Sequence, residues 1–118
     1  MTHPNDRTPV LKTAPDARAD LFGGSGVVKV WDLMRAAADP FTAVLWCELE
    51  AGGSVGAHRQ EAFAEIVVGV EGEGEATVDG TLSPLSAGDM VHLPLGSVLS
   101  LRCTSDRPLR YLIIKARG

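Results

Sequence analysis

Three side chains with metal-binding or hydrogen-bonding chemistry, His58, Gln60 and Glu65, fall close together in the segment GAHRQEAFAEIVVGVEGEG, residues 56–74. Two residues apart on an extended strand, His58 and Gln60 leave the same face with Cα atoms about 7 Å apart. Glu65 starts the next expected strand and could bring a carboxylate to the same point. An imidazole, an amide oxygen and a carboxylate can form one face of a divalent-ion site, and they can equally satisfy one another by hydrogen bonds.

The elements that must position these groups are short strands. From residue 26 onward, β-rich runs are separated by Gly, Pro and Asp, as an antiparallel sandwich or barrel requires. From Leu99 to Thr104 apolar and polar residues alternate, so one face of that run points inward. Asp79 and Gly80 form a tight-turn pair that closes a hairpin. We expect strands near residues 26–31, 42–50, 56–60, 64–70, 74–79, 89–93, 98–104 and 109–116.

Two segments are expected to lie outside these strands. Residues 1–20 carry three prolines among polar residues, which predicts an extended or disordered N-terminal arm before a single domain at residues 21–118. Residues 33–39 are rich in helix formers, with Asp32 as an N-cap and Pro40 as a stop. This pattern predicts one short helical turn at most.

Two groups of residues resemble the two sequence motifs of the cupins. The first motif of that family combines a glycine, a His-x-His pair, a glutamate and a closing glycine. The second combines a glycine, a proline and a glycine with a histidine and an asparagine. The resemblance implies an all-β fold, a double-stranded β-helix or jelly-roll barrel, over about residues 22–116. The matching residues are Gly52, His58, Gln60, Glu65 and Gly72 for the first motif, and Gly88, Pro94 and Gly96 for the second.

The chain departs from these motifs where their chemistry lies. Gln60 stands at the second histidine of the first motif, and its neutral amide oxygen suits calcium or magnesium better than iron, copper or nickel. Leu99, which has no lone pair, stands at the histidine of the second motif. Cys103 stands at the asparagine, but four residues along a strand place it about 13 Å from Leu99, too far to replace the missing ligand.

A barrel pocket with an incomplete ligand set is therefore expected. We expect its ligand-binding residues to be His58, Gln60, Glu65 and Leu99, and the three polar ones are the candidate metal ligands. His92 is a further candidate metal ligand, although both faces of its run MVHLP contain apolar side chains. A divalent metal ion is the only cofactor that these residues suggest. They identify no catalytic group.

The missing imidazole favours binding over metal catalysis. We expect a pocket that binds a small organic ligand and is noncatalytic or holds a weak, atypical metal site. The alternative is a metal-dependent cupin enzyme of the dioxygenase or isomerase type, with His58, Gln60 and Glu65 as ligands, so whether the protein is an enzyme stays open. A third hypothesis is an interaction module that docks through an outer face around Trp46.

Composition limits the partners. The formal net charge is −4 and the basic residues are scattered, which argues against nucleic acid as a partner. No apolar run approaches the roughly 18 residues of a membrane span, and the N-terminal residues lack an export signal, so we expect no membrane partner and a cytoplasmic location. Cys47 and Cys103 are expected to be free, buried thiols. The resemblance further implies a homodimer formed through sheet contacts.

Overall fold

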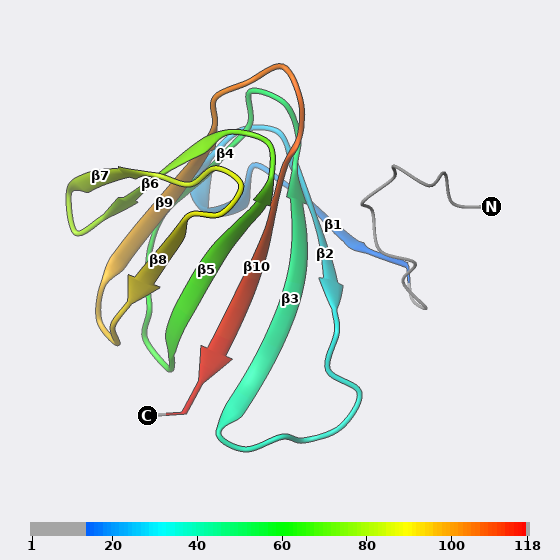
Figure 1. Ribbon diagram of the computed structural model, residues 1–118, viewed down its shortest axis with the longest axis vertical. Coiled ribbons are helices and arrows are strands. Elements are labelled where there is room, and N and C mark those ends of the chain that lie inside the picture. Colours follow the sequence, from blue (N-terminus) through cyan, green and yellow to red (C-terminus); the bar gives the residue numbers. More distant parts are fainter. Residues whose placement is uncertain (1–13, 118) are drawn as a thin grey trace.

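Two antiparallel sheets face each other in the computed structural model, which describes residues 14–117 (Figure 1). The larger sheet has the strand order β1-β2-β3-β10-β5-β8, and the smaller has the order β4-β9-β6-β7. The strands are β1 (Asp16–Ala19), β2 (Val27–Asp32), β3 (Phe41–Leu49), β4 (Ser54–Arg59), β5 (Ala64–Glu71), β6 (Gly74–Val78), β7 (Thr81–Pro84), β8 (Met90–Leu93), β9 (Val98–Cys103) and β10 (Leu109–Ala116). This arrangement confirms the predicted all-β jelly-roll barrel.

The core lies between the two sheets because alternate residues of each strand point inward. In β9, Leu99, Leu101 and Cys103 are buried, as the alternation predicts. In β3, Cys47 and Leu49 are buried on the inner face. Both cysteines are buried and free, which confirms that prediction.

The predicted hairpin turn at Asp79 and Gly80 joins β6 to β7. Both residues have positive φ, 49° and 82°, the backbone form that a two-residue hairpin loop needs. The strand after this turn, β7, was missing from the sequence expectation. It is a four-residue edge strand, too short to show a period of its own.

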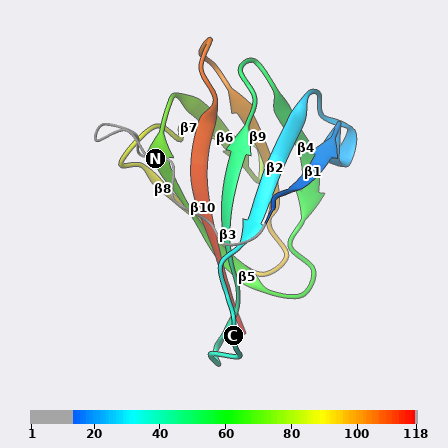
Figure 2. The same cartoon turned by 90° about the vertical axis from the view of Figure 1, so that its right-hand side faces the viewer.

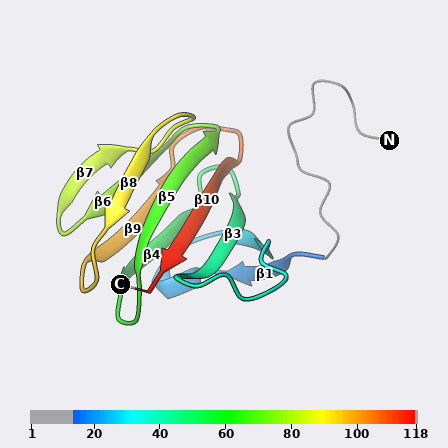
Figure 3. The ribbon, with the colours of Figure 1, turned by 60° about the horizontal axis from the view of Figure 1, so that its bottom comes forward.

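The N-terminal part of the described chain crosses from one sheet to the other. Strand β1 pairs with β2 at the edge of the larger sheet. A 3-10 turn, η1 (Leu21–Gly23), then carries the chain to β4, where Ser25 forms a bridge with Ser54 (Figure 3). The last residues of the expected arm are thus an edge strand. Residues 1–13 of that arm lie outside the described residues, so its remaining part and the domain boundary stay predictions.

The prediction of a helical turn at residues 33–39 is wrong. The segment is an irregular loop, in which the Asp32 carboxylate accepts a hydrogen bond from the backbone N–H of Met34. The loop packs against the C-terminal end of the chain, where Arg117 donates from its backbone to Pro40 and from its side chain to Asp39 (Figure 2). These contacts replace the helical hydrogen bonds that the propensities favour. No helix within residues 14–117 has the length and apolar character of a membrane span.

Candidate functional site

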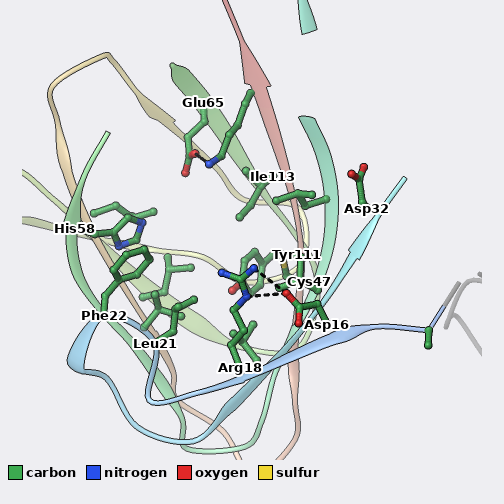
Figure 4. A pocket seen from close by; sticks show the side chains of 18 residues that line it. Asp16, Arg18, Leu21, Phe22, Asp32, Cys47, His58, Glu65, Tyr111 and Ile113 are labelled. Carbon is green, nitrogen blue, oxygen red and sulfur yellow. Dashed lines mark hydrogen bonds and ion pairs between the residues drawn. The ribbon is translucent and has the colours of Figure 1, made fainter. Parts of the chain in front are cut away.

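A cavity of about 560 Å³ opens between the two sheets on the side of β1 (Figure 4). Its floor consists of fully buried side chains, among them Cys47, Leu99 and Tyr111. Its mouth carries exposed groups: the side chains of Asp16 and Arg18 are 61% and 58% exposed. A pocket of this size with mainly apolar walls and a few converging polar groups is typical of small-molecule sites.

His58 reaches the pocket wall from β4, where the pairing with β9 shifts register between Val55 and His58. Its Nδ1 lies 2.9 Å from the carbonyl oxygen of Gly56. A carbonyl only accepts, so Nδ1 carries the hydrogen, and Nε2 is the ring nitrogen that a ligand in the pocket could reach. Phe22 stacks on the imidazole with ring centroids 4.1 Å apart, which fixes the ring plane (Figure 4).

Glu65 approaches the same pocket from β5 and is almost completely buried. Its cross-strand partner on β10 is Lys115, whose Nζ lies 3.7 Å from Oε2 of Glu65 (Figure 4). Burial raises the pKa of the Glu65 carboxyl above its ordinary value, while the charges of Lys115 and His58 oppose that rise. Glu65 is therefore easier to protonate than an exposed glutamate and can donate as well as accept a hydrogen bond.

Leu99 lies directly opposite His58, because the two residues are Cα partners in the β4–β9 pairing. Its side chain is 1% exposed and lines the pocket. The structure thus brings His58, Glu65 and Leu99 together, as the sequence predicts. The group opposite the imidazole is a hydrocarbon.

Gln60 does not line this pocket, although it is buried. Its backbone pairs with the turn before β9, donating to Ser97 and accepting from Gly96. Within residues 14–117 its side-chain Nε2 has no hydrogen-bond partner. The structure therefore does not place Gln60 in the pocket with His58. Gln60 comes directly after the last residue of β4, and its backbone bonds to the turn before β9 instead of continuing the sheet.

The prediction of His92 as a further metal ligand is wrong. On β8, Val91 and Leu93 are buried, whereas Met90 and His92 are exposed on the outer face. Its partner across the sheet is Ile66, which is also an exposed outer-face residue. The imidazole of His92 therefore points away from the pocket.

The donor set of the pocket does not fit a catalytic metal ion. Such a site requires three or more protein ligands that converge on one point. The pocket brings together His58 and Glu65, and the carboxylate of Glu65 already faces Lys115. Across residues 14–117 no group of three or more His, Cys, Asp or Glu side chains is placed to hold a metal.

The floor of the pocket carries two groups that resist ionisation. Cys47 and Tyr111 lie next to each other on β3 and β10. Burial, reinforced by the neighbouring Glu65 carboxylate, raises the pKa of the Cys47 thiol to about 12. Burial also raises the pKa of Tyr111 well above its usual range. At neutral pH both groups are uncharged, and Cys47 is a poor nucleophile.

Sequence reasoning missed several polar and aromatic residues of the pocket. Asp16 and Arg18 come from the expected arm, Phe22 comes from η1, and Lys115 comes from the last strand. The alternation of Asp16 and Arg18 was the available signal, since both side chains leave one face of an extended chain. It could not be used without knowing that β1 pairs with β2 at the pocket edge.

Comparison with known proteins agrees with this architecture. The family described as Cupin domain matches residues 45–115. A relative from Thermotoga maritima, named oxalate-binding protein, is 30% identical over 102 residues, which cover 85% of this chain and 84% of the relative.

Two solved structures are similar over most of the chain. One, described as a predicted oxalate decarboxylase from Thermotoga maritima, has a TM-score of 0.84 at 27% identity and covers 91% of this chain and 95% of its own. The other, a Cupin 2 conserved barrel domain protein from Salinispora arenicola, has a TM-score of 0.69 at 27% identity and covers 87% and 82%. With its two sheets, its pocket and the family match over residues 45–115, this chain belongs to the cupin family.

Proposed function

We propose that this protein binds a small organic acid in the barrel pocket and does so without a catalytic metal ion. The observation that carries the proposal is the presence of Arg18 and Lys115, two groups that can bind a carboxylate, in the lining of one cavity with apolar walls. The relative named oxalate-binding protein supports a small acid as the ligand class.

The test is thermal unfolding of the purified protein in the presence of a panel of small organic acids. A ligand at 100 times its Kd stabilises the folded state by about 2.7 kcal/mol, which raises Tm measurably. We expect at least one acid to raise Tm and a chelator to leave Tm unchanged. A panel without any stabilising acid would contradict the proposal.

The alternative is a metal-dependent enzyme of the dioxygenase or isomerase type. One observation favours it: Nδ1 of His58 donates to the Gly56 carbonyl, as the second ring nitrogen of a metal-binding histidine does. Elemental analysis after expression in medium supplemented with iron, manganese, nickel and zinc separates the two functions. Metal at near one equivalent, lowered by Glu65→Gln, would support the enzyme, whereas trace metal supports the binding protein.

We further propose a homodimer through the outer face of the six-stranded sheet. An apolar row crosses five neighbouring strands there, each residue being the partner of the next. Met90, at one end, is 57% exposed, so part of this apolar row faces solvent in the monomer. The row consists of Trp31, Trp46, Leu112, Val68 and Met90.

A second copy suits this row, because a two-fold axis can place the same sheet face against itself. Light scattering during gel filtration should give twice the chain mass at micromolar concentration. Replacing Met90 by Lys should shift the species toward the monomer, and the same change at exposed Leu82, on the other sheet, should not. A wild-type monomer would contradict the proposal. The cytoplasmic location and the absence of nucleic-acid and membrane partners stay predictions.

A further inference from the structure

We propose that the ligand of the pocket is a monocarboxylic acid with an aliphatic or aromatic body, bound with its carboxylate at Arg18 and its body against the apolar walls. This inference rests on the proposed function and narrows its ligand class. It differs from oxalate, the ligand in the name of the Thermotoga maritima relative.

The walls of the pocket suit a ligand with an apolar body. Hydrocarbon side chains from both sheets and from η1 make up half of the pocket lining, and a ligand gains affinity from them only by burying apolar surface of its own. Oxalate consists of two joined carboxylates and has no such surface. These hydrocarbon side chains are those of Leu21, Phe22, Val28, Val30, Leu45, Val55, Leu99, Leu101 and Ile113.

The charged side chains of the pocket leave room for one carboxylate. Its lining includes two permanent cations, Arg18 and Lys115, and three acidic side chains, Asp16, Asp32 and Glu65. Two of the acids already face the cations, in the pairs Arg18–Asp16 and Lys115–Glu65. Lys115 is paired with Glu65, so Arg18 is the cation that remains for one carboxylate. The second carboxylate of a dianion would meet the acidic side chains without a cation of its own.

The contacts of Arg18 orient its guanidinium for a ligand carboxylate. Its Nε lies 2.8 Å and one of its Nη atoms 2.7 Å from the same oxygen of Asp16, which orients the guanidinium. Among residues 14–117 its other Nη has no hydrogen-bond partner and can donate to a ligand. Figure 4 shows this group reaching from β1 toward the space in front of His58 and Phe22. Because Arg18 stands at the exposed mouth, a carboxylate bound there keeps part of its hydration.

The pocket is deep enough for a hydrocarbon body. Behind Arg18 the pocket continues to the buried side chains of Leu99 and Tyr111. A cavity of about 560 Å³ admits a body much larger than a second carboxylate. The two requirements, one charge at the mouth and apolar bulk within, together describe a monocarboxylic acid with a hydrocarbon body.

Calorimetric titration of the wild-type protein with acetate, butyrate, hexanoate, hexanamide and oxalate tests this inference. Each methylene buried should tighten Kd about fourfold, so hexanoate should bind more tightly than butyrate, and butyrate more tightly than acetate. Hexanamide, which has the same body without the charge, should bind at least tenfold more weakly than hexanoate. Oxalate should bind more weakly than hexanoate.

A pair of variants tests whether the ligand carboxylate binds at Arg18. Arg18→Gln should weaken hexanoate binding at least tenfold and leave hexanamide binding unchanged. The control Arg102→Gln, at an exposed arginine outside the pocket lining, should bind hexanoate as the wild type does. The series in the wild-type protein needs no variant, so it remains decisive if Arg18→Gln fails to fold.

The outcomes separate this inference from the proposed function. Oxalate binding more tightly than hexanoate, equal binding of acid and amide, or no effect of Arg18→Gln would overturn the inference and leave an acid-binding pocket in place. If neither these acids nor any member of the wider acid panel binds, the proposed function fails as well.

Discussion

The segments that resemble the two cupin motifs differ in what they retain. The first, residues 52–72, keeps both its turn glycines and two chemically active groups, His58 and Glu65, in the pocket. The second, residues 88–103, keeps its turns at Gly88 and Gly96 but presents only hydrocarbon to the pocket. The backbone requirements of the barrel are met in both segments, and the ligand chemistry in only one. Turn geometry and site chemistry can therefore change independently on this fold.

The largest expected effect lies in the second segment, where Leu99 acts as core. Leu99→Ala should lower the free energy of unfolding by about 2–5 kcal/mol, because a fully buried leucine is lost. His58→Ala, in the half-buried opposite position, should cost about 1 kcal/mol. Urea denaturation measures both. Equal losses of unfolding free energy in the two variants would show that position 99 is no more important to the core than position 58.

Restoring a donor to the second segment should have the next largest effect. Leu99→His places an imidazole opposite His58, and without metal it should lose about 1–3 kcal/mol of stability through a buried polar group. Zinc or nickel should raise the Tm of this variant and leave the wild-type Tm unchanged.

Leu101→His, on the same strand, is the control for the rise in Tm that metal should cause in Leu99→His. It faces Val55 instead of His58, so metal should raise its Tm less. If wild type and Leu99→His respond to metal alike, the interpretation of position 99 as the missing ligand is wrong.

A smaller effect is expected at the retained turns. Gly96 has φ of +90°, and a Cβ there would meet no neighbouring atom within 4 Å. Gly96→Ala should therefore cost only the backbone strain, about 1–2 kcal/mol. Leu95→Ala, which alters an exposed side chain next to Gly96, should leave the Tm of thermal unfolding almost unchanged. A neutral Gly96→Ala would mean that this turn does not need its glycine.

The smallest effect concerns the pH dependence that the first segment contributes. Because the pKa of Glu65 is raised in the folded state, the folded protein holds this proton more tightly than the unfolded chain does. The stabilisation that comes from this proton on Glu65 is fully present below the ordinary pKa of 4.5. It is lost as pH rises through the higher pKa that Glu65 has in the folded protein.

Glu65→Gln removes this dependence. Relative to the wild type, the variant should gain stability as pH rises from 4.5 toward neutrality, as measured by unfolding midpoints in a pH series. The variant Glu61→Gln, at an exposed carboxyl, should follow the wild-type curve. A pH-independent difference between Glu65→Gln and the wild type would contradict the raised pKa.

Local patterns predicted most of the fold. Alternation in β9, the Asp79–Gly80 turn and the motif glycines gave the strands, one hairpin and the family resemblance, because each depends on neighbours in the chain. The pairing of β1 with β2 depends on residues farther along the chain, so Arg18 and Asp16 could not be assigned to the site. For His92 the alternation failed for another reason: the outer face of its sheet is also apolar, which removes the contrast between faces.

The stacking of Phe22 on His58 gives the pocket an internal spectroscopic signal. Protons above the face of an aromatic ring resonate at higher field, so the ring hydrogens of His58 should be displaced in a proton NMR spectrum. The chain contains only three histidines, which keeps that region of the spectrum simple. A molecule that enters the cavity and moves Phe22 aside would return these resonances toward ordinary positions, so occupancy could be followed without any label.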